Sequence, residues 1–355
     1  HELGHFLVAK YFDVKVLKFS LGFGPKLVWR TVGETEYSIR YIPLGGFVKM
    51  LGESIDDADE PLTPEDTKRS FSNQHVLKRI AIAGAGPLFN LLLALLIFCF
   101  FYMFAGNQVM TPQIGQVTPE SPAHQAGLLK GDIIASINGK PIDRWSEIKN
   151  AVKDSAGKPL EIIVKRKDLP LTFTVIPETS VVKNIFGEDI QRHIIGISSA
   201  GEVVNLRMNP AETFVESLRQ TYNITKLTIV SIVKLIQGTV STKTLGGPIM
   251  IAEMAGQQAR EGAVNLVFFI ALLSINLAII NFLPIPVLDG GHLLYFAYEG
   301  ITGKPLSEAA QAHGQRIGLA LILSLAGLTM TASAPSATSK ATSRSASREF
   351  AGSCW

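Results

Sequence analysis

The sequence begins with HELGH, in which two histidines four positions apart enclose a glutamate. Residues i and i+4 lie on one face of an α-helix, so His1 and His5 can direct their imidazoles at a single metal ion. Glu2 lies beside them, where its carboxylate can polarise a water molecule on that ion. The pattern is typical of zinc-dependent hydrolases, although two histidines on a helix surface also match it by chance.

A second segment, far along the chain, offers the ligand that the first one lacks. A catalytic zinc ion usually takes three protein ligands and keeps one position for water. The segment NFLPIPVLDGGHLL places Asp289 at the end of a long apolar run, where an ionisable side chain is costly and indicates a function. Pro284 and Pro286 interrupt the helix before it, so the backbone can turn the carboxylate inward. Two complementary half-sites are less expected by accident than either one alone.

The composition predicts that this chemistry takes place in a membrane. The chain is 47% hydrophobic and 18% charged, with a mean hydropathy of +0.26, whereas a soluble chain carries about 25% charged residues. Residues 80–104 and 264–288 form apolar runs long enough for a hydrocarbon core, which needs about 20 residues. A third run, 317–330, is shorter. We therefore expect an integral membrane protein that interacts with the lipid bilayer.

Charge and cysteine content exclude other classes. The net charge of +3 gives no electrostatic reason to expect nucleic acid binding. The two cysteines, Cys99 and Cys354, make neither a disulfide framework nor a CxxC pair. Any metal site must therefore use histidine and carboxylate ligands.

Residues 111–202 change to a soluble α+β pattern. Asn138-Gly139 predicts a tight hairpin turn, and strand-like segments follow at 161–166 and 171–178. The stretch SPAHQAGLLKGDIIASINGKPIDRW resembles a bacterial PDZ domain, a fold that binds an extended peptide by adding it to a sheet edge.

One segment of the PDZ-like region is the candidate peptide-binding strand. In HIIGISS, residues 193–199, the groove residues would be Ile195, Gly196 and Ile197. The same segment is also consistent with an ordinary core strand. Peptide C-termini are the ligands that we expect at such a groove.

The remaining segments complete the expected architecture. Residues 19–50 predict a short hairpin or β-loop, and the acidic stretch 53–69 predicts a solvated connector. Asn209, Pro210 and Glu212 have the residue types of a helix start, for an amphipathic helix lying on the membrane or packed on the PDZ-like domain.

The predicted fold is a multi-pass α-helical membrane protein with an inserted α+β PDZ domain and a short membrane-associated β-loop. Its expected parts are an N-terminal membrane half (1–110), the PDZ domain (111–202), a helical connector (203–262) and a C-terminal membrane half (263–332). A Ser/Ala/Thr-rich tail (333–355), disordered or vector-derived, would follow. The chain opens inside a helix, and we expect earlier turns of that helix to be missing here.

The order of these motifs resembles the site-2 protease family of intramembrane zinc metalloproteases. HELGH, GFGPKL, IPLGGFVKM, GPLFN, the PDZ-like module and NFLPIPVLDGGHLL follow one another as in that family, over residues 1–330. The resemblance implies that His1, His5 and Asp289 are the zinc ligands and Glu2 the general base. It also implies a bacterial cytoplasmic-membrane enzyme, with zinc near the cytoplasmic side and the PDZ module in the periplasm.

The family resemblance further implies how a substrate would be held. Its substrates would be single-span membrane proteins of the anti-sigma factor type, or remnant signal peptides. IPLGGFVKM would pair with an extended substrate strand through Leu44, Gly45, Gly46, Phe47 and Val48.

Three polar residues near the motifs have more than one interpretation. Asn281 in NxxPxPxLDG would bind substrate or a developing oxyanion, or alternatively hydrogen-bond a neighbouring helix. Asn90 is interpreted as a helix-packing contact. His292 is interpreted as a supporting residue, because a fourth protein ligand would take the place of water.

Two rival functions remain from the sequence. A non-catalytic membrane scaffold would explain the PDZ-like region, but not the paired HELGH and LDGG motifs. A transporter with an ion site would call for repeated halves, and the sequence contains no internal repeat. The chain also differs from the best-known family member in having room for one PDZ module instead of two.

Overall fold

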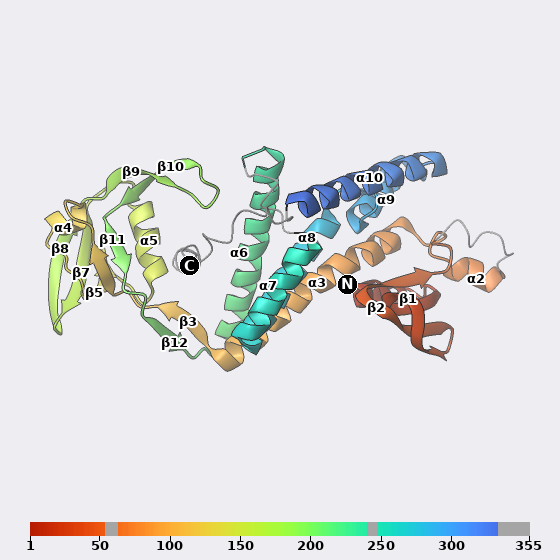
Figure 1. Cartoon of the computed structure of the whole chain (residues 1–355), viewed down its shortest axis with the longest axis horizontal. Coiled ribbons are helices and arrows are strands. Elements are labelled where there is room, and N and C mark those ends of the chain that lie inside the picture. The colour runs from red at the N-terminus through yellow and green to blue at the C-terminus, as the bar shows by residue number, and fades with distance from the viewer. Residues whose placement is uncertain (54–62, 240–246, 333–355) are drawn as a thin grey trace. The chain divides into compact units, whose positions relative to one another are not determined.

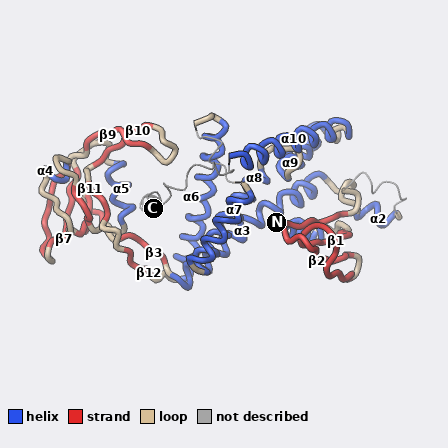
Figure 2. The backbone as a smooth tube through the Cα atoms, viewed as in Figure 1, coloured by secondary structure: helices blue, strands red, loops and turns tan. Residues whose placement is uncertain are grey.

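The computed structural model describes residues 1–53, 63–239 and 247–332 (Figures 1 and 2). The chain divides into two compact units. The first unit comprises His1–Ala94, Ile224–Ile229 and Ser241–Trp355, and the second comprises Leu95–Asn223 and Val230–Val240. The expected tail and most of the acidic connector lie outside the described residues.

Apolar helices dominate the first unit. Its helices are α1 (Glu2–Tyr11), α2 (Pro64–Arg69), the first part of α3 (Val76–Ala105), α7 (Pro248–Glu261), α8 (Ala263–Phe282), α9 (Asp289–Thr302) and α10 (Glu308–Ala332). Within the described residues, α3 and α8 are long and apolar enough to cross a membrane. Of the two apolar runs, the first lies wholly inside α3. The second run is helical only as far as Phe282, the last residue of α8, because Pro284 and Pro286 follow.

A β-hairpin connects the helix that carries HELGH to the rest of the first unit. Strand β1 (Val16–Val32) pairs antiparallel with β2 (Thr35–Met50). The predicted β-loop is therefore a long hairpin rather than a short one. The register between the two strands shifts repeatedly. Gly22 has a φ of +87°, and a Cβ at this position would lie only 2.5 Å from the Ile42 carbonyl oxygen. Such glycine bulges allow long strands to bend and continue.

Ion pairs fix the turn of the hairpin to both neighbouring helices. The Glu34 carboxylate accepts hydrogen bonds from Arg69 at 2.7 Å and from Lys10 at 2.6 Å. The Arg69 guanidinium, helped by Lys10, lowers the pKa of Glu34 to about 2. Arg69 also contacts Asp13 at 3.1 Å. The hairpin is thus held at the end of α1, about two helical turns from the histidines.

The second unit has a β-rich core built around antiparallel strands. Strands β5 (Ile133–Ile137), β6 (Lys140–Pro141), β7 (Leu160–Arg166) and β8 (Leu169–Val175) form one sheet in the order β6-β5-β7-β8. Three further pairs join β3 (Asn107–Met110) with β12 (Val203–Leu206), β4 (Ile114–Val117) with β11 (Ile197–Ser199), and β9 (Glu178–Lys183) with β10 (Asp189–Ile194). Two helices, α4 (Pro122–Gln125) and α5 (Trp145–Asp154), complete the unit's core.

The predicted turn of the second unit is present, and one predicted strand differs. Asn138 and Gly139 have φ values of +50° and +74°, as the predicted primed turn requires. The β3–β12 pair extends the α+β fold beyond the expected 111–202. HIIGISS is not one strand, because β10 ends at Ile194 and the chain turns at Gly196, whose φ is +79°. A Cβ at Gly196 would lie 2.2 Å from the Ser121 Cβ, so glycine is needed there.

The predicted connector helix is α6 (Pro210–Ile236), a single helix. Its start has a capping box, in which the Asn209 side chain accepts from the Glu212 N–H and the Glu212 carboxylate accepts from the Asn209 N–H. Near its end, Lys234 pairs with Glu188 at 2.6 Å. This contact joins α6 to the β9–β10 hairpin within the second unit.

Candidate metal centre

The two histidines of HELGH lie where α1 packs closely against α3. A Cβ at Gly4 would lie 2.5 Å from the Ala85 carbonyl oxygen, so the two backbones approach at a glycine. His5 is buried, and its Nδ1 donates to the Ile82 carbonyl of α3 at 2.8 Å. This bond fixes the ring, assigns the proton to Nδ1 and leaves the Nε2 lone pair for a metal.

The third donor comes from a tight turn between α8 and α9. Pro284 and Pro286 end the helix, and α9 then begins at Asp289. A Cβ at Gly290 would lie 2.2 Å from the Leu283 carbonyl oxygen, and one at Gly291 would lie 2.4 Å from the oxygen of Ile285. The glycines after Asp289 therefore let the chain fold back closely enough to present the carboxylate.

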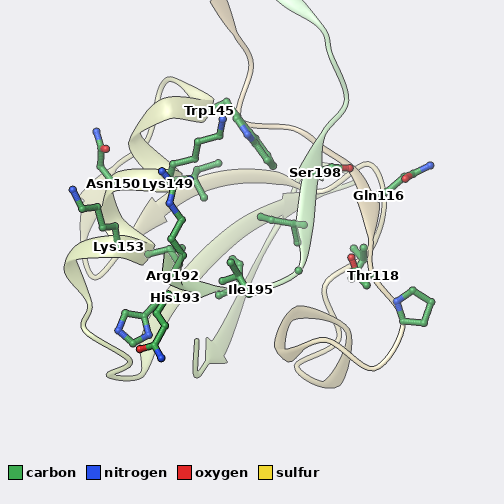
Figure 3. Close-up of a pocket in the computed structure, with 18 of the residues that line it drawn as sticks. Gln116, Thr118, Trp145, Lys149, Asn150, Lys153, Arg192, His193, Ile195 and Ser198 are labelled. Carbon is green, nitrogen blue, oxygen red and sulfur yellow. The ribbon is translucent and has the colours of Figure 1, made fainter. Parts of the chain in front are cut away.

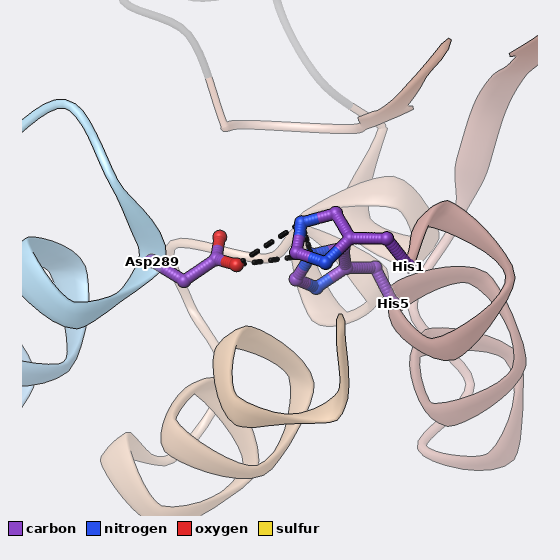
Figure 4. A group of neighbouring side chains, drawn as sticks. All are labelled: His1, His5 and Asp289. Carbon is purple, nitrogen blue, oxygen red and sulfur yellow. Dashed lines mark hydrogen bonds and ion pairs between the residues drawn. The ribbon is translucent and has the colours of Figure 1, made fainter. Parts of the chain in front are cut away.

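The three donor atoms meet in one place (Figure 4). The Oδ2 atom of Asp289 lies 3.2 Å from His1 Nε2 and 3.6 Å from His5 Nε2. The two Nε2 atoms are 3.4 Å apart. Ligands about 2.0–2.1 Å from a tetrahedral zinc ion are separated by roughly 3.3–3.4 Å. The spacing of the donors therefore fits one zinc ion without rearrangement.

Two further observations support that fit. Asp289 Oδ2 is buried and makes no hydrogen bond of acceptable geometry, and its neighbouring imidazoles can pair with its charge only when they are protonated. The donors also lie against Gly86 of α3, where a Cβ would come within 2.2 Å of His5 Nε2 and 2.8 Å of His1 Cε1. A glycine there leaves the space that the two rings occupy. The residues present are thus a suitable donor set for zinc.

The predicted general base lies between the histidines and the hairpin. The Glu2 Cγ atom would be 3.2 Å from a Cβ placed on Gly46, so its side chain lies against the backbone of β2. On the other side, the Asn281 side-chain nitrogen lies 3.4 Å from His1 Nε2. Asn281 is therefore a direct neighbour of a metal donor, and the side chain of Glu2 lies at the adjoining strand.

The predicted substrate-pairing residues lie along the end of β2. Gly46, Phe47 and Val48 pair with Leu21, Ser20 and Phe19 of β1, and Gly45 precedes them with a φ of +74°. Leu44 belongs to the same strand. Within the described residues this end of β2 pairs only with β1. Its other edge is therefore available to a further strand.

Comparison with known proteins establishes the family. The model of Peptidase family M50 matches residues 1–325. The chain belongs to peptidase family M50. The M50 chain is 35% identical over 336 residues to a candidate zinc metalloprotease of Rhizobium meliloti, covering 92% of this chain and 90% of the relative. It is 38% identical over 328 residues to one of Campylobacter jejuni, covering 92% and 86%.

The assignment confirms the family and enzyme class expected from the motif order. The M50 chain is a zinc metalloprotease of the site-2 type. Solved structures that match a part of the chain include the HtrA3 PDZ domain bound to a phage-derived ligand, with 28% identity, a TM-score of 0.18 and coverage of 20% of this chain and 80% of that one. Another is the PDZ domain of the SdrC-like protein from Listeria monocytogenes, with 20% identity, a TM-score of 0.20 and coverage of 24% and 84%.

Some contacts of the M50 metal centre cannot be predicted from the sequence. The Ile82 carbonyl that orients His5 is a main-chain group on an apolar residue, which no residue pattern reveals. Asn90 was expected only to pack helices, and its backbone oxygen does accept from Ser274 at 2.7 Å. Its side-chain nitrogen, however, also lies 3.4 Å from His1 Nδ1, beside the centre. His292 packs against the ring of Tyr295 and is not among the three donors.

A groove of about 1400 Å³ lies within the second unit of the M50 chain (Figure 3). Helix α5 forms one wall, and the chain from β10 into β11 forms another. Ile195, Gly196 and Ile197 all line it, as predicted for a peptide-binding strand. Ile195 is also only 3% exposed and belongs to the hydrophobic core, so this part of the segment packs as a core strand does, and peptide binding stays a prediction.

Proposed function

We propose that this M50 protease cleaves the membrane-spanning segment of single-span membrane proteins. The main support is the close approach of the donor atoms of His1, His5 and Asp289, which come from opposite ends of the sequence. These donors lie against α3 and close to the end of α8. Both helices are long and apolar enough to span a bilayer. A hydrolytic centre between such helices is suited to a substrate that itself lies in the membrane.

In this proposal His1, His5 and Asp289 hold the zinc ion, and Glu2 is the general base. When bound, zinc supplies an acidified water molecule and polarises the scissile carbonyl. The Glu2 carboxylate would take a proton from the attacking water and deliver it to the leaving amine nitrogen. Its contact with Gly46, on the strand that would hold the substrate, supports this role.

The substrate helix must unwind before it can be cut, because its carbonyls are otherwise hydrogen-bonded within the helix. The open edge of β2, from Leu44 to Val48, would pair with the unwound segment and replace the lost backbone hydrogen bonds. The Asn281 amide would donate to the substrate carbonyl or to the oxyanion that develops from it.

Substrate identity and orientation rest on the resemblance to the bacterial regulator-of-sigma-E protease. That resemblance supports anti-sigma factors or remnant signal peptides as substrates, in a sigma-E type stress response. It also supports a bacterial inner-membrane location, with the metal centre towards the cytoplasm and the second unit in the periplasm. We further propose that the groove beside α5 binds extended peptides, including C-termini, by strand addition to β11.

The test separates metal binding from catalysis. In the purified full chain, Glu2→Gln should keep about one zinc per protein but lower cleavage of a single-span reporter by about 10²–10⁴-fold, as expected for loss of a general base. Asp289→Ala should lose the zinc as well. Glu65→Gln, in the exposed first turn of α2, is the matched control and should change neither.

Two outcomes would contradict the proposal. Unchanged cleavage by Glu2→Gln would remove Glu2 from its assigned role. Stoichiometric zinc in Asp289→Ala would show that the three donors do not form the metal centre. If the wild-type chain binds peptides but neither holds zinc nor cuts, the scaffold interpretation is favoured instead.

A further inference from the structure

The groove of the second unit has an apolar floor. Trp145, Ile148 and Val152 of α5 line it and are each 7% exposed or less. Ile195 and Ile197 line the facing wall. An extended chain directs alternate side chains to opposite faces. A peptide lying here would therefore direct every second side chain to this floor, where aliphatic residues fit.

The rim of the groove carries only one sign of charge. Its lining residues include Lys130, Lys149, Lys153 and Arg192, and no aspartate or glutamate lines it among the described residues. All four cations are exposed, and none forms an ion pair within the described part of the chain. Figure 3 shows Lys149, Lys153 and Arg192 along the α5 side, across from the strand that carries Ser198.

Two of these cations are arranged at a cost to their own helix. Lys149 and Lys153 are four residues apart on α5, so they lie on one face. Like charges at this spacing destabilise a helix slightly. An anionic ligand in the groove would attract both ammonium groups and so offset this repulsion.

The facing strand can accept such a ligand. Among the described residues, β11 pairs only with β4. Ile197 and Ser198 of β11 line the groove. A peptide strand placed between β11 and α5 would have main-chain partners on one side and the basic rim on the other.

We propose that this groove selects extended peptides in which aliphatic residues alternate with aspartate or glutamate. The inference rests on the proposed peptide-binding role of the groove and adds its chemical preference. Main-chain pairing with β11 and contacts with the apolar lining would provide the affinity, while Lys149, Lys153 and Arg192 discriminate between acidic and neutral sequences. The partner is thus an acidic, unstructured segment rather than a neutral or basic one.

The experiment uses the full chain in a neutral detergent and two fluorescein-labelled peptides. One has the sequence Glu-Val-Asp-Val-Glu-Val, and the other is its amide twin, Gln-Val-Asn-Val-Gln-Val. Fluorescence anisotropy should show the acidic peptide binding about threefold to tenfold more tightly, since each exposed ion pair is worth a factor of about two to five. Raising the ionic strength to about 1 M should reduce this preference.

Charge variants test the assignment to the rim. Lys149→Gln combined with Arg192→Gln should markedly reduce the preference, with only Lys153 of the three discriminating cations left, and leave binding of the amide twin unchanged. Lys140→Gln combined with Lys165→Gln removes the same charge outside the groove lining and should preserve the preference.

The remaining outcomes distinguish the inference from its foundation. If both peptides bind equally and the rim variant has no effect, the groove binds peptides but the acidic preference is wrong. If neither peptide binds, the proposed peptide-binding role itself fails. If soluble glycerol 1-phosphate binds instead and is lost in the rim variant, the rim recognises a lipid headgroup and the peptide proposal is overturned.

Discussion

Replacing Gly86 with alanine should expel zinc while leaving α3 intact. Gly86 lies inside a helix, where alanine is intrinsically favoured over glycine by about 1 kcal/mol. The added Cβ, however, would lie 2.2 Å from His5 Nε2 and 2.6 Å from His5 Cε1. The ring cannot simply swing away, because its Nδ1 is hydrogen-bonded to the Ile82 carbonyl.

The size of the effect follows from the distances. A carbon and a nitrogen in ordinary contact are about 3.4 Å apart, so the ring must retreat by roughly 1 Å. Zinc sites tolerate about 0.2 Å in ligand distance. His5 would therefore be lost as a zinc ligand, or the other ligands would have to move by a comparable distance to keep it. We expect zinc affinity to fall by at least about 100-fold, or about 2.7 kcal/mol.

Gly84 provides the control. It lies two residues earlier in α3, and a Cβ there would meet nothing within 4 Å outside its own helix. Zinc titration against a competing chelator, with metal content by mass spectrometry, should give wild-type affinity for Gly84→Ala and greatly weakened affinity for Gly86→Ala. Wild-type zinc affinity in Gly86→Ala, with its helical circular dichroism unchanged, would refute the close packing of the two histidines on α3.

Two electrostatic contacts of the first unit give further predictions. Arg79→Met should lower the thermal midpoint of unfolding and weaken zinc binding, because Arg79 pairs with Glu299 of α9 and both side chains are largely buried. Arg79→Met combined with Glu299→Met should recover much of the stability, since no unpaired charge is then left buried. A double variant as unstable as Arg79→Met alone would contradict this reasoning. The Glu34 carboxyl should titrate by carbon NMR with a pKa of about 2, and Arg69→Gln should return it towards its ordinary value of 4.5. Because the pKa of Glu34 is lower in the folded protein than in the unfolded chain, its carboxylate stabilises the folded state by about 1–2 kcal/mol above pH 4.5. This stabilisation is lost as the pH falls towards 2. Thermal melts of the zinc-free protein across this pH range should show the loss.

The sequence predicts most of what depends on local residue types. The helix start at Asn209 follows from side chains that cap a helix, and the turn at Asn138-Gly139 follows from residues that tolerate positive φ. The convergence of HELGH with Asp289 follows from what zinc requires of its ligands. The length of the β-hairpin does not follow, because glycine-rich segments are also typical of loops, and only the pairing of distant strands decides between the two. The Ile82 carbonyl is equally hidden, since every residue has one.

The distance along the chain between the histidines and Asp289 also affects when the enzyme becomes active. Synthesis proceeds from the N-terminus, so a nascent polypeptide exposes the HELGH helix long before the turn that carries Asp289 is made. Until α9 has emerged and docked, only two of the three donors exist. With the zinc ligands proposed above, a partly made chain would lack a complete metal centre during its own insertion, and hydrolytic competence would coincide with completion of the fold.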